Sequence, residues 1–234
     1  MNLDSRSFAG FTPDAPEYLR ALAANNRKEW FEGHRDDFAD LLQKPLLQLA
    51  AALAGPLLAV DPDLVTIPGR VVSRIHRDTR FSRDKSPYKT TMWLTFKRPL
   101  KEWRDAPAFF FEIAPAFYRY GMGFYGASKD TMDRLREVID RRPDEFRQAV
   151  AFLAGEGRFV PEGEQYRRML KDDLPADLRD WYQRKNLYLV CCRRIDDRLF
   201  DRGLADDLRD GFNLLAPFYE YLRKVKLGRT SNFW

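Results

Sequence analysis

The spacing of apolar residues changes twice along this 234-residue chain, and these changes limit the folds it can adopt. Up to about residue 58, apolar side chains recur every three or four positions, as on one face of an α-helix. Between residues 70 and 125, short runs of Val, Ile, Thr and aromatic residues are separated by turn residues, which indicates β-strands. Helical spacing then returns. This order predicts an α+β fold, in which an antiparallel sheet packs against N-terminal and C-terminal helices.

The boundaries of the elements follow from the same pattern and from local cap signals. Helices are expected to begin near Asp14 and to cover residues 27–42, 45–58, 129–141, 143–154, 175–185 and 204–225. Strands are expected at residues 70–78, 90–97, 108–114, 117–125 and 187–193. Asn26, with Glu29 three residues later, fits the N-cap of the second helix, and Ser128 fits that of the helix at 129–141.

Composition favours a single domain spanning residues 1–234. Apolar residues make up 44% of the chain and charged residues 32%, which is typical of a soluble globular protein. The sequence shows no internal repeat and no low-complexity linker. The residues expected in the core are Leu22, Trp30, Phe31, Leu41, Val72, Ile75, Phe110, Ile113, Leu135, Ile139, Phe146 and Leu189.

A cytoplasmic location without membrane contact is the simplest expectation. The longest apolar stretch, residues 46–60, is interrupted by Gln48, Gly55 and Pro56 and is too short to cross a bilayer. The first residues lack the basic start and apolar core of a secretory signal. Cys191 and Cys192 are adjacent and cannot link distant segments, which fits a reducing compartment.

Positive charge is concentrated in residues 70–104. This window contains eleven Lys or Arg and three acids, a balance of +8, whereas the whole chain carries +5. Its centre, RFSRDKSPYK at residues 80–89, is polar and turn-forming, and loops of this kind often carry functional side chains. Arginine and lysine bind phosphate and carboxylate oxygens. We therefore expect a small phosphate- or carboxylate-bearing ligand, with candidate contacts at Arg77, Arg80, Ser82, Arg83, Lys85, Tyr88 and Lys89.

Several sequence blocks occur together and in order. They are FAGF at 8–11, NNRKEWF at 25–31, RDTRFSRDKSPYKT at 77–90 and GMGFY at 121–125. Over residues 8–221 the chain resembles the domain-of-unknown-function family 2461 (DUF2461), a conserved hypothetical bacterial family. It differs at Trp93, where a glycine is common, and at Ala127, where a proline is common. The resemblance implies which segments belong together and implies no activity.

A structural interpretation of the block at 77–90 competes with the ligand site. Asp78 and Asp84 would pair with neighbouring arginines and fix a long hairpin connection, while Phe81 and Tyr88 would pack it onto the core. Strand alternation, however, places charged residues on both faces of residues 70–78, so part of this segment must face a cleft, a partner or water. This favours a ligand site, with Arg80 and Lys89 as the first candidates because each lies next to an aromatic residue.

The sequence does not decide whether the protein is an enzyme. His76 and Asp78 are the acid–base candidates, because they lie on the same side of the predicted strand. No metal site is indicated, since the only histidines, His34 and His76, are in separate segments. No cofactor is indicated either. The glycine run at 121–126 matches neither phosphate-binding pattern and predicts a bulge or a close backbone approach to a ligand.

Two other classes of function remain as alternatives. Nucleic acid could bind the basic residues and stack on the interleaved aromatic residues Phe81, Tyr88, Trp93, Phe96 and Trp103. Against this, no RRM, KH or helix-turn-helix signature is present. The aromatic-rich surface could instead dock another protein without catalysis. The sequence gives no indication of oligomeric state.

Overall fold

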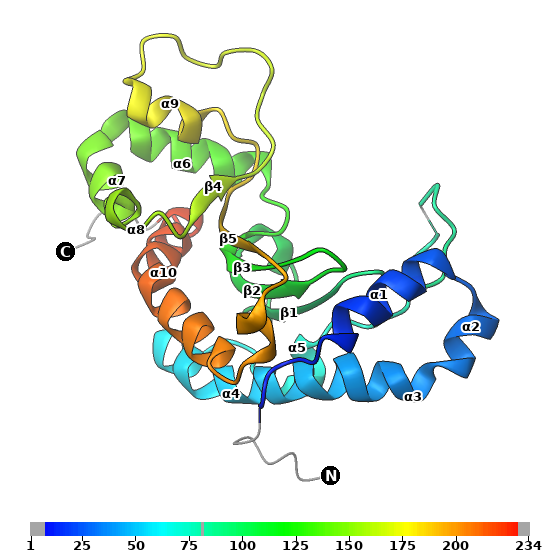
Figure 1. Cartoon of the computed structure of the whole chain (residues 1–234). Helices are drawn as coiled ribbons and strands as arrows, with labels where there is room; N and C mark the ends of the chain where they lie inside the picture. The colour runs from blue at the N-terminus through cyan, green and yellow to red at the C-terminus, as the bar shows by residue number, and fades with distance from the viewer. Residues whose placement is uncertain (1–7, 81, 229–234) are drawn as a thin grey trace. The chain divides into compact units, whose positions relative to one another are not determined.

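The structure, a computed structural model, describes residues 8–80 and 82–228 (Figure 1). Inter-residue contacts divide the chain into two compact units. The first unit contains residues 1–96, 110–120 and 192–210, and the second contains residues 97–109, 121–191 and 211–234. The expectation of a single domain over residues 1–234 stays a prediction.

Within the described residues, five antiparallel strands form one sheet, in the order β1-β2-β3-β5-β4. With the helices they confirm the predicted α+β class. β1 (Met92–Phe96), β2 (Pro107–Ile113) and β3 (Phe117–Phe124) follow one another as the predicted meander. β5 (Tyr188–Arg194) pairs with β4 (Val160–Glu162), with Val160 opposite Val190. The sequence pattern missed β4 because three residues that include Pro161 are too short to show an alternation.

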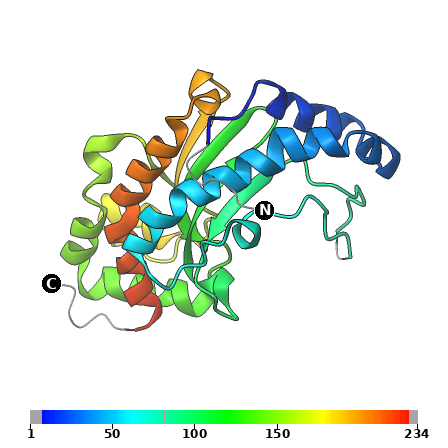
Figure 2. The ribbon, with the colours of Figure 1, turned by 90° about the horizontal axis from the view of Figure 1, so that it is seen from below.

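Most helices of the first unit lie in its N-terminal part. They are α1 (Asp14–Ala24), α2 (Lys28–Gly33), α3 (Arg35–Phe38), a π turn (Ala39–Gln43), α4 (Lys44–Val60) and α5 (Pro68–Val71), with a 3-10 turn at Asp197–Phe200. Figure 2 shows α1 beside the helix that runs from α3 through the π turn into α4.

The second unit contains the short helices and turns that follow β1 and β3. They are a 3-10 turn (Trp103–Asp105), α6 (Lys129–Arg141), α7 (Pro143–Val150), α8 (Leu153–Glu156) and α9 (Ala176–Tyr182). α10 (Leu204–Lys226) has residues in both units. Ser128 caps α6 as predicted, because its side-chain oxygen accepts a hydrogen bond from the Thr131 amide.

The expected break between helices at residues 42–45 was wrong. The chain breaks earlier, at His34, and is then helical over Arg35–Val60. Pro45 has no amide hydrogen, and its ring would collide with the carbonyl one turn back in a regular α-helix. The π turn removes this conflict by widening the helix, and the Lys44 amide bonds to the Ala39 carbonyl, five residues back.

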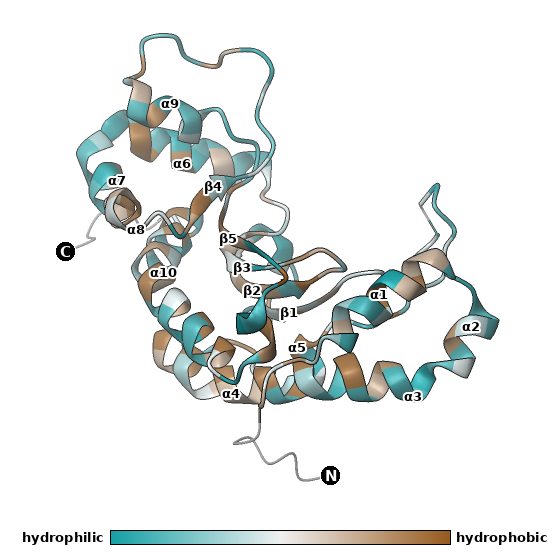
Figure 3. Cartoon of the chain, viewed as in Figure 1, coloured by the Kyte–Doolittle hydropathy of each residue, from teal (hydrophilic) through white to brown (hydrophobic). Residues whose placement is uncertain are grey.

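The continuous helix is longer and more apolar than residues 46–60 alone suggested. By length and composition it could cross a membrane, a test that the core helices of soluble proteins also pass. Its buried residues Leu46, Leu49, Leu53 and Leu57 recur every three or four positions and form one face of α4. Figure 3 shows apolar residues in brown along this helix. This pattern is that of a helix packed against the core of its unit.

The predicted strand at residues 70–78 was also wrong. This segment makes only two isolated bridges among the described residues, Val72 with Leu94 and His76 with Tyr88. The two bridges are four positions apart in the segment that contains Val72 and His76 (76 − 72). They are six positions apart in the segment that contains Tyr88 and Leu94 (94 − 88). The two extra residues form a bulge, which interrupts the regular ladder. A regular strand therefore does not form, and the face assignment derived from strand alternation does not hold here.

The predicted core is mostly correct. Eight of the twelve residues are buried: Leu22, Phe31, Ile75, Ile113, Leu135, Ile139, Phe146 and Leu189. Trp30, Leu41, Val72 and Phe110 are half-buried. Leu42 is buried in place of Leu41, because both lie in the π turn, where the wider winding changes which residues face the core.

Glycines in β3 allow a close approach to β5. A Cβ atom at Gly121 would lie 1.9 Å from the Leu189 carbonyl oxygen, and one at Gly123 would lie 2.3 Å from that of Leu187. The close backbone approach at these glycines is therefore to the neighbouring strand, and the expected approach to a ligand was wrong at Gly121 and Gly123.

We expect Gly121→Ala to destabilise the protein by about 2–4 kcal/mol, because the new methyl group would collide with backbone that cannot move without disturbing the sheet. Gly33→Ala is the matched control, since no atom lies within 4 Å of its Cβ position. Urea unfolding measures both. Equal stability of the two variants would show that the strands are not this close.

Candidate anion-binding site

The predicted site lies on an exposed loop of the first unit, which we call the basic loop (residues 74–89). Backbone hydrogen bonds close its base: the Arg77 amide donates to the Pro87 carbonyl at 2.8 Å, and the Lys89 amide donates to the Ile75 carbonyl at 2.9 Å. The loop is the teal segment beyond α1 in Figure 1. Phe81, which was expected to anchor it, lies outside the described residues.

Asn26 fixes the base of the basic loop to the junction of α1 and α2. Its side-chain amide donates to the Tyr88 carbonyl at 2.9 Å and accepts from the Tyr88 amide at 3.0 Å. The predicted role as N-cap was wrong, because Arg27 occupies the N-cap of α2 without a side-chain bond. The Phe31 ring stacks on Tyr88 at 4.2 Å. The sequence blocks at 25–31 and 77–90 therefore meet at Tyr88, which is buried.

Arg77 is held within the loop by Asp84 and Ser86. Its guanidinium forms an ion pair with Asp84 and donates to the Ser86 hydroxyl oxygen at 2.9 Å. Asp84 also accepts hydrogen bonds from the amide and hydroxyl of Ser86. These bonds to Ser86, with a further contribution from Arg77, lower the pKa of Asp84.

Arg80 and Asp78 form a second pair. Two side-chain hydrogen bonds of 2.9 and 2.8 Å join the guanidinium to the carboxylate, and the Arg80 amide adds a third. These bonds lower the pKa of Asp78 to about 2. Asp78 is therefore ionised at neutral pH, and a carboxylate with so low a pKa is a weak general base.

The two lysines have no carboxylate partner among the described residues. The Lys85 ammonium donates to the Thr79 carbonyl at 2.8 Å, and that of Lys89 donates to the Arg74 carbonyl. The Lys89 ammonium also lies 4.5 Å from the centre of the Trp93 ring. Burial, with a smaller contribution from Arg74, lowers the pKa of Lys89. Each ammonium keeps further N–H donors, because it has three.

The remaining candidates are more exposed or have weaker contacts. Arg83 and His76 are exposed, and Ser82 is half-buried with its amide 3.4 Å from the Thr79 carbonyl. The His76 ring lies 5.3 Å from that of Tyr88. The structure thus brings Arg77 to Asp84, Arg80 to Asp78 and Lys89 to Trp93. Each of these three cations therefore has a different partner.

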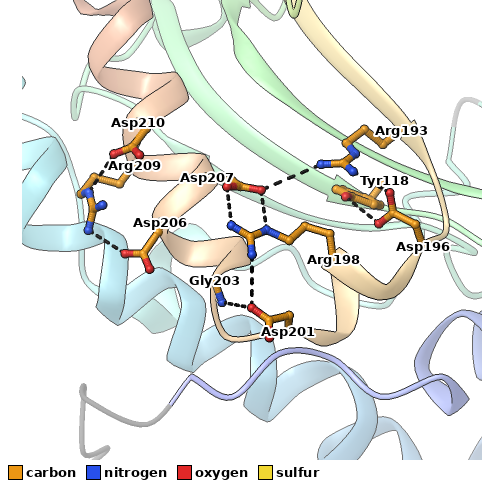
Figure 4. A network of polar contacts seen from close by, with 10 residues as sticks. All are labelled: Tyr118, Arg193, Asp196, Arg198, Asp201, Gly203, Asp206, Asp207, Arg209 and Asp210. Carbon is orange, nitrogen blue, oxygen red and sulfur yellow. Dashed lines mark hydrogen bonds and ion pairs between the residues drawn. The ribbon is translucent and has the colours of Figure 1, made fainter.

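A second polar network, near the end of β5, has a structural explanation (Figure 4). Asp207 accepts two hydrogen bonds of 2.6 Å from Arg198, and Asp196 accepts from Arg193 and from the Tyr118 hydroxyl. These bonds connect β3, the end of β5 and the first turn of α10. This network was not predicted from the sequence, although the acids at the start of α10 are a recognisable signal for a helix N-terminus.

The family model described as "Conserved hypothetical protein (DUF2461)" matches residues 14–221. This match covers most of the chain, so the protein belongs to the DUF2461 family. No curated protein matches the chain.

We expect Asn26→Ala to destabilise the protein by about 1–3 kcal/mol, because both backbone groups of the buried Tyr88 lose a partner. Hydrogen exchange at the Arg77 and Lys89 amides should accelerate as the loop opens. Asn213→Ala, on the exposed face of α10, is the control and should leave both rates unchanged. Unchanged hydrogen-exchange rates in the Asn26 variant would show that the bonds between Asn26 and Tyr88 do not hold the loop.

Proposed function

We propose that the protein binds a small anionic ligand, bearing phosphate or carboxylate, on the basic loop. This proposal is based on the positive charge that remains on the loop after its internal ion pairs are formed. The loop contains six Lys or Arg and two acids, a balance of +4, and each acid is already bound to an arginine of the loop. Lys85 and Lys89 donate to carbonyls, which leaves their charge unneutralised.

The geometry supports a preorganised site. Asn26 and Phe31 hold one end of the loop on the core of the first unit, and the ion pairs fix the conformation between its ends. A ligand then meets cations whose side chains have already lost part of their freedom. This reduces the entropy cost of binding. Lys85, Lys89 and the exposed Arg83 are the contacts we rank first.

Binding is better supported than turnover. Asp78 has too low a pKa to act as a general base near neutral pH. His76 is exposed and stays the acid–base candidate of the block, together with Lys89, whose pKa is lowered. The proposal therefore assigns a ligand and assigns no reaction. A cytoplasmic location is part of the proposal.

A small ligand is better supported than nucleic acid. Of the aromatic residues expected to stack on bases, Tyr88 and Phe96 are buried, with 3% and 0% of their surface exposed. They are therefore not accessible to bases, and base stacking is a main source of affinity for single strands. Trp93 is half-buried, and the Lys89 ammonium lies over its ring.

We expect one or more members of a panel of phosphorylated metabolites, nucleotides and organic acids to raise the melting temperature of the wild-type protein. Calorimetry on the best ligand should give an affinity at least about tenfold weaker for Lys89→Gln and Arg83→Gln, because each loses a charge-assisted hydrogen bond. Lys44→Gln, an exposed lysine on α4, should bind as the wild type does.

Two results would contradict the proposal. One is a ligand whose affinity changes equally in the loop variants and in Lys44→Gln. The other is a panel in which no member stabilises the wild type more than the loop variants. Fluorescence anisotropy with labelled single-stranded and duplex DNA at low and moderate salt tests the alternative class, because binding to nucleic acid weakens steeply as salt increases.

A further inference from the structure

A cavity in the second unit has a lining suited to a different ligand. It has a volume of about 680 Å³, within the range of about 300–1,000 Å³ typical of sites for small molecules. It is open to solvent, and three segments that are distant in sequence line it: the 3-10 turn Trp103–Asp105 with the residues before it, the start of α6, and the end of α10. None of the described residues of the basic loop lines it.

Cations from all three segments line this cavity. They are Lys101, Arg104, Arg134 and Lys226. Lys226 forms an ion pair with Asp105, and Arg134 donates to the Lys226 carbonyl at 2.6 Å. Lys101, Arg104 and Arg134 have no carboxylate partner among the residues that the structure describes. Within the described residues, no ion pair therefore neutralises the charges of these three cations.

Besides Asp105, which pairs with Lys226, the lining contains the acids Glu102 and Asp130, and these give the cavity a mixed character. A site for inorganic phosphate alone has no need of carboxylates, which repel it. A ligand that carries a phosphate together with hydroxyl or amino groups uses both kinds of residue, because carboxylates accept hydrogen bonds from such groups.

Two aromatic rings next to the lining, those of Trp103 and Tyr125, contact the lining residue Arg104. The Arg104 guanidinium lies 5.1 Å from the Trp103 ring centre and 5.7 Å from that of Tyr125. The two rings are 5.3 Å apart, and Tyr125 is 57% exposed. The Lys97 ammonium lies 3.3 Å from the Trp103 ring centre and covers one face of the indole. Tyr125 is therefore the ring that offers a surface for stacking.

Internal bonds hold the rim of the cavity in place. Asp105 accepts a hydrogen bond of 2.7 Å from the Ser128 amide and pairs with Lys226. Burial alone would raise the pKa of Asp105, but the bonds from Lys226, Ser128 and Thr131 together lower it. The Gly126 amide donates to the Arg104 carbonyl at 2.8 Å, which joins the residue after Tyr125 to the 3-10 turn.

We propose that this cavity binds a phosphorylated nucleoside. Lys101, Arg104 and Arg134 bind the phosphate, and the carboxylates of Glu102 and Asp130 accept hydrogen bonds from the sugar or the base. The base stacks on the exposed ring of Tyr125. The proposal rests on the lining of this cavity and is independent of ligand binding on the basic loop.

The test is calorimetry with AMP, adenosine and inorganic phosphate on the wild type and three variants. AMP should bind more tightly than adenosine. Arg134→Gln should weaken AMP by at least about tenfold, as expected for a lost charge-assisted hydrogen bond. Tyr125→Ala should weaken AMP by about tenfold, as expected for one stacking contact, and should leave phosphate binding unchanged. Arg141→Gln, on the same helix outside this cavity, should have no effect.

Three results would overturn the proposal: no binding of AMP at about 1 mM, equal affinity for AMP and adenosine, or equal loss in the Arg134 and Arg141 variants. Lys89→Gln separates the two sites. AMP affinity that is unchanged in this variant supports the cavity. AMP affinity lost in Lys89→Gln and retained in Arg134→Gln would place AMP on the basic loop and reject the cavity.

Discussion

The bond between the Asn26 side chain and the Tyr88 backbone is the constraint on which the basic loop depends. A buried peptide group needs a partner for both its donor and its acceptor, and one amide side chain supplies both here. Because these residues are 62 positions apart, this single contact joins the helical part of the first unit to the loop. The Phe31 ring covers Tyr88 and completes the anchor. A highly charged segment can then stay exposed and still keep a defined conformation.

The charges of the loop serve two purposes, and the structure separates them. Arg77 and Arg80 bind the only two acids of the loop and hold its shape, which is the structural interpretation of the block. Lys85, Lys89 and Arg83 have no such partner in the described part of the chain and supply the charge for a ligand. The structural and the ligand-binding interpretations are therefore compatible, since each applies to different residues.

Local signals in the sequence predicted local structure well. Ser128 and the apolar spacing after it were enough to place α6 at Lys129–Arg141, and short runs of β-branched and aromatic residues between turn residues were enough for β1 to β3. The predictions that failed concern residues whose partners are distant in the sequence. The amide of Asn26 fits an N-cap in sequence, and only the fold shows that Tyr88 is its partner. In the same way, Lys101, Arg134 and Lys226 are far apart along the chain, so no motif could reveal the cavity that they line.

The most direct test of the central claim is an NMR titration of the ¹⁵N-labelled protein with inorganic phosphate. We expect the amide signals of Ser82, Arg83 and Lys85 to shift with a saturable dependence on phosphate, and we expect Asn26→Ala to weaken this response. Shifts spread evenly over exposed lysines and arginines, or shifts on the loop that do not saturate and are unaffected by Asn26→Ala, would contradict a preorganised anion site.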